Sequence, residues 1–205
     1  GIIEGNVEIS ESVTSLKGLE GLTEVGGDLV LNNHAFRGIG ETLKSSLNSL
    51  AGLENLEKVG GDLKILHNPL LFSLSGLDSL KEVGGQLRLY QNGNLRNLSG
   101  LESLQRIGGS LTIEEETNLL SLAALSSLEE LNGLGISKTA ITSLGDIFDG
   151  ITSLDASLYI TGNDKLASLK GLEDLSTVGS GVTVWENDQL TSLTGLEGLT
   201  KIGYG

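Results

Sequence analysis

The amino-acid sequence predicts a repeat solenoid of about eight turns, with one continuous parallel β-sheet and little helix. Three observations support this prediction. A motif returns every 23 or 24 residues, apolar and polar residues alternate within each copy, and the apolar content is almost purely aliphatic. Of the 205 residues, 38% are hydrophobic but only 3% are aromatic, which suits a core that repeats one cross-section many times. We expect residues 1–205 to form a single solenoid.

The repeated motif is clearest in residues 59–65, 83–89 and 107–113, which read VGGDLKI, VGGQLRL and IGGSLTI. The alternation at the end of each segment is typical of a short, half-buried strand. The glycine pair allows a tight corner before the strand, with positive φ if needed. Eight copies carry the apolar-x-apolar pair, beginning at Val7, Leu29, Leu63, Leu87, Leu111, Leu134, Leu158 and Val182. We expect them to pair as parallel strands, because no single turn can bury its leucines alone.

An asparagine follows four of these strands at a fixed offset, at Asn68, Asn92, Asn163 and Asn187. A buried Asn side chain can bond the backbone groups freed at a corner, so stacked copies would form a ladder. A leucine-rich stretch comes next, such as LTSLTGLEGL at residues 190–199. Its leucines are expected to line the opposite wall of the coil.

These motifs resemble the leucine-rich repeat, L-x-x-L-x-L-x-x-N-x-L, which residues 125–144 follow closely with Thr139 at the Asn position. The VGGxLxI variant of the other turns is similar to the receptor L-domain, a leucine-rich β-helix of receptor ectodomains and fungal cell-wall proteins. The resemblance implies a right-handed, β-helix-like coil and a non-enzymatic binding or adhesion module at the cell surface or outside the cell. The cysteine-rich modules of the animal receptors are absent, which favours a microbial or cell-wall surface protein over a hormone receptor.

The composition excludes several classes of function. A net charge of -14 argues against a nucleic-acid partner, which would require a basic stripe. The absence of cysteine excludes a thiolate metal site, and no apolar run approaches the length of a membrane span. We expect no cofactor and no catalysis, because His34 and His67 stand apart and no Ser has a His at triad-like spacing. Residues 114–116, all Glu, are interpreted as an exposed corner rather than an acid/base pair.

One surface suited to recognition is formed by the outward position of each strand. Core positions stay fixed while these vary, as a recognition surface requires, although drift on an idle surface gives the same pattern. The outward residues are Glu8, Val30, Lys64, Arg88, Thr112, Gly135, Tyr159 and Thr183. Tyr90 and Trp185 occupy the next equivalent corner position and would add contacts. From this surface we select Lys64, Arg88, Tyr90, Tyr159 and Trp185 as candidate partner contacts.

A second candidate surface is an insertion at residues 32–46, within the second turn. The step from Val25 to Val59 is ten residues longer than the usual 24. The excess contains His34, Phe36 and Arg37, which are rare residue types in this chain. Because loops on a rigid scaffold often carry function, we expect this segment to project from the coil and contact a partner.

Acidic residues form a third regular feature. A carboxylate follows each Gly-Leu pair, at Glu20, Glu54, Asp78, Glu102, Glu173 and Glu197. Stacked turns would place these about 4.8 Å apart, and a solvated, partly neutralised face is favoured over a cation-binding stripe. The Asn-Asp pairs at residues 163–164 and 187–188 could bind calcium, but no EF-hand spacing supports this, so a calcium site is not the favoured interpretation. The glycosylation sequon Asn97-Leu98-Ser99 stands where other turns place a structural Ser. We therefore do not expect glycosylation at Asn97.

Two functions are carried forward. The leading hypothesis is an extracellular or cell-surface module that binds a protein or glycan ligand. The alternative is a structural stalk, cell-wall or filament subunit in which the repeat is a spacer or self-assembles. Neither end shows a recognisable cap, so we expect a piece of a longer protein, or ends that dock on neighbouring copies. A carbohydrate-active β-helix enzyme and an ice-binding protein are less well supported, because the charges are scattered and the Thr array is interrupted.

Overall fold

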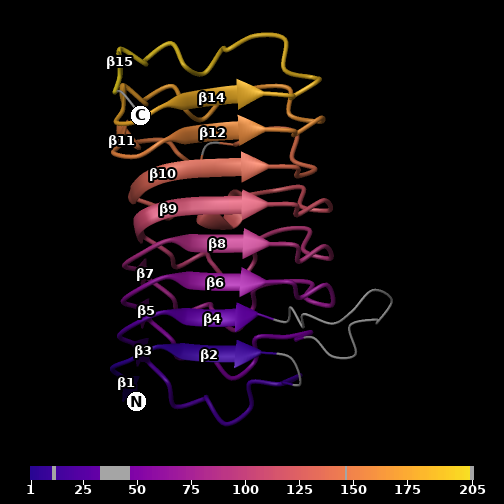
Figure 1. The fold of residues 1–205 in the computed structure, drawn as a ribbon, viewed down its shortest axis with the longest axis vertical. Helices are drawn as coiled ribbons and strands as arrows, with labels where there is room; N and C mark the ends of the chain where they lie inside the picture. The colour runs from indigo at the N-terminus through magenta and orange to yellow at the C-terminus, as the bar shows by residue number, and fades with distance from the viewer. Residues whose placement is uncertain (11–12, 33–46, 146, 204–205) are drawn as a thin grey trace.

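The computed structural model describes residues 1–10, 13–32, 47–145 and 147–203. It confirms the predicted repeat solenoid: successive turns stack into a tall coil with parallel strands, as Figure 1 shows. Within the described residues, helix is limited to one 3₁₀ turn, η1, at Ala123–Leu125.

The eight predicted strands form one continuous parallel row, which we call the long row. In chain order its members are β2 (Val7–Ser10), β4 (Leu29–Asn32), β6 (Leu63–Leu66), β8 (Leu87–Tyr90), β9 (Arg106–Glu114), β10 (Glu130–Ser137), β12 (Leu158–Thr161) and β14 (Val182–Trp185). Equivalent residues face one another: Leu63 lies opposite Leu87, and Leu87 opposite Leu111. Leu29 also lies opposite Leu63, although 34 residues separate them, so the longer second turn keeps the register.

A second row of short strands, the short row, was not predicted. Its members are β1 (Ile2–Ile3), β3 (Glu24–Val25), β5 (Lys58–Val59), β7 (Glu82–Val83), the first residues of β9 and β10, and then β11 (Ser153–Leu154), β13 (Thr177–Val178) and β15 (Lys201–Ile202). These residues carry the apolar side chain that precedes each corner. The row is interrupted once: β10 pairs with β9, and β11 pairs with β13, but β10 and β11 belong to separate ladders.

The glycine pairs allow neighbouring turns to touch through their backbones. Gly60, Gly84 and Gly108 do not have positive φ, so the conformational freedom considered from the sequence is not used there. A Cβ on Gly84 would instead lie 2.2 Å from the carbonyl oxygen of Gly60, and a Cβ on Gly108 2.3 Å from that of Gly84. Only glycine permits this stacking distance.

The core is almost wholly aliphatic, as the composition predicted. Inward residues of the long row, such as Leu63 and Ile65, are fully buried, and the leucines of the opposite wall pack against them. Leu71 and Leu74 represent that wall in the turn that begins with β6. Phe148 is the one aromatic residue of the described chain inside this cluster.

The predicted asparagine ladder is present and extends beyond the asparagines. The backbone N–H of Asn68 donates to Asn92 Oδ1 at 3.0 Å, and that of Asn163 donates to Asn187 Oδ1 at 3.0 Å. Each Nδ2 donates to a carbonyl of the preceding turn, as from Asn92 to Ile65 at 2.8 Å. The side chains therefore satisfy the polar backbone groups left buried at each corner.

Glu116 occupies the ladder position of its own turn, which corrects the expectation of an exposed acidic corner at residues 114–116. Its side chain is fully buried, and Oε1 accepts hydrogen bonds from Asn92 N at 2.9 Å and Asn92 Nδ2 at 2.8 Å. Oε2 has no hydrogen-bond partner. Burial raises the pKa of Glu116 to about 7, because the charged form loses its hydration.

The carboxylates after each Gly-Leu pair have a local structural role. The glycine before each of them has positive φ and donates its N–H to the carboxylate two residues later, as from Gly100 to Glu102 at 2.7 Å. The same bond joins Gly76 to Asp78 at 2.7 Å. Each acid thus closes its own tight corner.

Candidate functional site

The outer face of the long row is built by the alternation within each strand. On β6, Leu63 and Ile65 point into the core, while Lys64 and Leu66 are only partly buried. Parallel pairing in register then places equivalent outward residues in columns that run along the solenoid axis. Lys64 lies beside Arg88, and Tyr159 beside Thr183.

The part of this face over β6, β8 and β9 is charged, and its cations are paired. Lys64 Nζ lies 2.7 Å from Asp62 Oδ2, and this hydrogen bond lowers the pKa of Asp62. Arg88 donates from Nε and Nη2 to Glu114 Oε2, at 3.0 and 2.8 Å. The guanidinium carbon of Arg88 also lies 5.2 Å from the centre of the Tyr90 ring, a cation–π distance. These side chains are held in place by one another.

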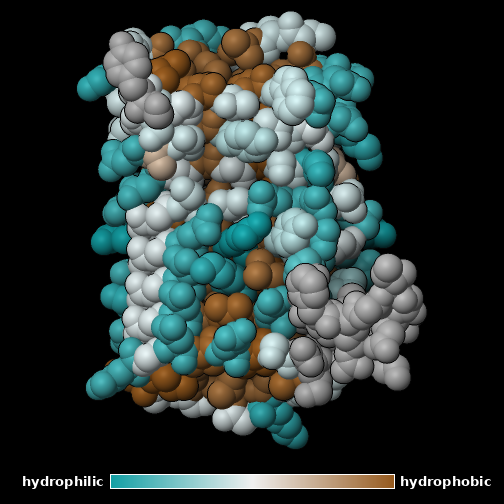
Figure 2. Space-filling view, viewed as in Figure 1, coloured by the Kyte–Doolittle hydropathy of each residue, from teal (hydrophilic) through white to brown (hydrophobic). Residues whose placement is uncertain are grey.

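The part of the face over β10, β12 and β14 has a different chemistry. At the long-row positions its outward residues are Gly135, Ser137, Tyr159, Thr161, Thr183 and Trp185, while the exposed Glu130 begins β10 at the short row. Tyr159 is 44% exposed and Trp185 is 62% exposed, which is unusual for rings of this size. Figure 2 shows this half of the face as mostly pale with hydrophobic residues between, whereas strongly hydrophilic residues gather over the middle of the stack.

Every strand of the long row from β6 onward ends in a left-handed residue. The non-glycine members are His67, Gln91, Glu115, Lys138 and Glu186, with φ between 51° and 56°. Glu115 accepts a hydrogen bond from Gln91 at 2.6 Å and one from Lys138 at 3.0 Å, which together lower its pKa. With Pro69, Gly93 and Thr117, these three side chains line a shallow pocket at the corner.

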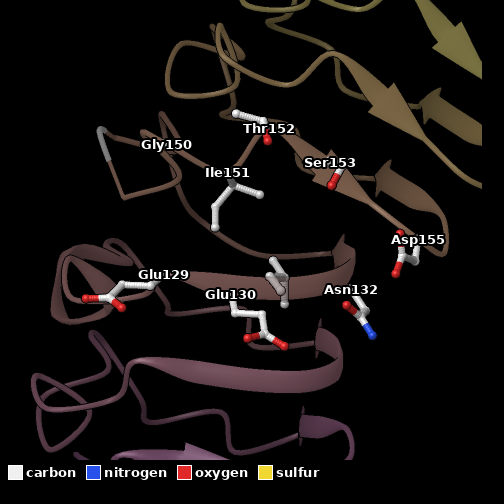
Figure 3. Close-up of a pocket in the computed structure, with 9 residues that line it drawn as sticks. Glu129, Glu130, Asn132, Gly150, Ile151, Thr152, Ser153 and Asp155 are labelled. Carbon is white, nitrogen blue, oxygen red and sulfur yellow. The ribbon is translucent and has the colours of Figure 1, made fainter.

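A second pocket lies where the short row is interrupted. Its lining residues are Glu129, Glu130, Leu131, Asn132, Gly150, Ile151, Thr152, Ser153 and Asp155. Figure 3 shows Glu129 and Glu130 on one side of the opening and Thr152 and Ser153 on the other. In the part of the chain that the structure describes, His, Asp and Glu side chains do not gather into a group that could hold a metal ion.

The structure separates the candidate contact residues into two groups. Lys64, Arg88 and Tyr90 come together on β6 and β8, and Tyr159 and Trp185 come together on β12 and β14. His34, Phe36 and Arg37 lie outside the described residues, as does the rest of the insertion after Asn32. Ion pairing of the first group and the uncharged character of the second were not anticipated, because both depend on strand register.

The parallel coil, its leucine core and its side-chain ladder define a leucine-rich solenoid. Residues 57–148, a little less than half of the chain, match the family described as Receptor L domain, so this part of the solenoid is similar to a receptor L-domain. Such domains are ligand-binding modules of the receptor type and occur in extracellular receptor ectodomains. No curated protein matches the chain. Among the described residues, helices long and apolar enough to cross a membrane are absent.

Proposed function

We propose that the protein is a non-enzymatic, extracellular or cell-surface module that binds a protein or glycan partner through the outer face of the long row. The observation that carries the proposal is the exposure of Tyr159 and Trp185 on a rigid, otherwise polar sheet. Large exposed rings on a preorganised surface are typical of recognition sites, since ordering them on binding costs little entropy. The family match supports the same class of function.

The insertion at residues 32–46 remains a second predicted contact segment. Its removal is a test independent of the sheet face. Deleting residues 34–44 is expected to weaken binding to the identified partner, and unchanged binding would restrict recognition to the sheet.

The proposal is tested by screening the chain against glycan and protein arrays, then measuring affinity for each hit. A Tyr159→Ala/Trp185→Ala double variant is expected to lose at least tenfold in affinity. Phe72→Ala is the matched control, because Phe72 is 65% exposed but follows β6 instead of lying on the sheet face. Equal affinities for all three proteins would contradict the proposal. Absence of any ligand, combined with self-association in light scattering, would favour the structural alternative of a stalk or filament subunit.

A further inference from the structure

The long-row positions of β10 (residues 134–137), β12 and β14 have uncharged outward side chains in a strongly acidic protein, although Lys138 follows β10 directly and is paired with Glu115. These outward positions hold glycine, hydroxyl and aromatic side chains, whereas 20% of the whole chain is charged and the net charge is -14. A partner recognised through its own charge would meet no countercharge at these positions. The surface is therefore suited to a neutral ligand.

The two exposed rings stand where neighbouring strands place them as a pair. Tyr159 lies opposite Thr183, and Thr161 opposite Trp185, so the rings are diagonal neighbours. Such positions are separated by roughly 7–8 Å, within reach of one ligand. Thr161 is only 6% exposed although it faces outward, so its neighbours cover it. Together Tyr159 and Trp185 offer two exposed rings, with the exposed Thr183 on the neighbouring strand beside Tyr159.

Gly135 is the outward residue beside this pair that has no side chain. It lies between Thr112 and Tyr159 in the sheet register. A Cβ at Gly135 would come no closer than 3.7 Å to any neighbour, and the backbone there does not have positive φ. Neither backbone conformation nor strand packing requires glycine at this position. The absence of a side chain leaves the Tyr159 ring uncovered from the β10 side.

We propose that Tyr159 and Trp185, with Gly135 beside them, form a subsite for a neutral oligosaccharide, which deepens the proposed binding function and rests on it. The apolar C–H faces of sugar rings stack on aromatic rings, while their hydroxyl groups bond to Ser and Thr. A few polar groups around an apolar platform are the usual composition of a small-ligand site. A protein partner would require about 800 Å² of surface with an apolar centre. The other exposed large apolar side chains of the described residues lie outside β10, β12 and β14; they are Ile2, Ile3, Val13, Leu70, Phe72, Leu120, Leu193 and Ile202.

The single tryptophan of the chain provides a direct readout, because all tryptophan fluorescence comes from Trp185. The probes are hexasaccharides of β-1,3-glucose, β-1,4-glucose, α-mannose and N-acetylglucosamine, with oligogalacturonate as an anionic counterpart. We expect at least one neutral probe to shift or quench the emission of the full chain, and oligogalacturonate to leave it unchanged.

Two substitutions test the location by calorimetry. Trp185→Ala removes one ring, and Gly135→Tyr places a bulky side chain beside Tyr159; each is expected to weaken binding of the active probe at least tenfold. The matched controls are Phe72→Ala, and Val30→Tyr at the equivalent outward position of β4. Both are expected to bind within twofold of the parent chain. Thermal melting of each variant separates loss of the subsite from loss of the fold.

Three results would overturn the inference. They are binding of the anionic probe alone, equal binding by all four variants, and no binding of any neutral probe. If a protein from the array binds instead and Trp185→Ala abolishes that complex, the module function stands while the sugar subsite is wrong. If neither sugars nor proteins bind, the proposed function fails as well.

Discussion

Glu116 is the residue whose chemistry differs most from its neighbours in the ladder. Asparagine at this position presents a carbonyl oxygen and an amide donor, as Asn92 does with its bond to Ile65. A protonated Glu116 would imitate this, with Oε1 as acceptor and Oε2–H as donor. The ionised form instead leaves a buried charge on Oε2, an atom without a hydrogen-bond partner. The protonated form is therefore the one that fits the ladder.

Stability should consequently depend on the protonation of Glu116. Its pKa is about 7 in the folded protein, against an ordinary value of 4.5. Because the folded pKa is the higher one, its contribution is fully present below pH 4.5 and is lost as the pH rises through 7. A shift of this size corresponds to about 3 kcal/mol at high pH. We expect Glu116→Gln, which stays neutral, to be the more stable protein at pH 8 by up to this amount.

Urea unfolding of both proteins at pH 5 and pH 8 measures this difference. Acidic groups with lowered pKa values, such as Asp62, act in the opposite direction, but they are common to both proteins and cancel in the comparison. If parent and variant show the same change in unfolding free energy between the two pH values, Glu116 is not the titrating group.

The position of Glu116 in the repeat predicts that it is buried in the ladder, but the run of three glutamates around it indicated an exposed corner instead. Three consecutive glutamates are typical of a solvated corner, and the first two are indeed partly exposed and paired with Arg88 and Lys138. The third lies five residues after Leu111, as Asn92 lies five after Leu87. Position within the repeat, and not charge, decides which side chain enters the ladder.

At the scale of the strand and its corner, the glycine pair should be the least replaceable element. Gly84→Ala would place a methyl group 2.2 Å from the carbonyl oxygen of Gly60, and backbone on both sides prevents relaxation. We expect a loss of about 3 kcal/mol or more in unfolding free energy. Gly93→Ala is the control, because a Cβ there meets nothing within 4 Å. Thermal and urea unfolding should show a near-neutral control; equal losses for the two variants would exclude the stacking explanation.

The short row of strands shows what the sequence pattern could not supply. Strands such as β5 and β7 contain two residues each, too few to show an alternation. They form because stacked turns bring equivalent backbone groups together, as when Gly84 N donates to Val59 O at 2.8 Å. The interruption between β10 and β11 is likewise not predicted by any property of the individual strands.

For the whole molecule, the alternation in the sequence predicted which strand residues lie on the outer face of the sheet, but it could not divide that face into two parts. Arg88 and Glu114 are 26 residues apart, and only the pairing of β8 with β9 makes them partners. Likewise, Tyr159 and Trp185 are recognisable as a pair only once β12 and β14 are in register. Rows of equivalent side chains along the solenoid axis exist only once the turns are stacked in register, so a single repeat does not show them.

Each turn contacts mainly its neighbours. The local unfolding free energy of one turn should therefore depend on the adjacent turns and little on distant ones. A defect at Gly84 is therefore expected to act locally. Hydrogen exchange of Gly84→Ala should show reduced amide protection in β6, β8 and β9, the strands nearest the substitution. Protection in β12 and β14, several turns away, should remain close to that of the parent chain. Loss of protection to the same extent in all strands would show that the solenoid unfolds as one cooperative unit, contrary to nearest-neighbour coupling.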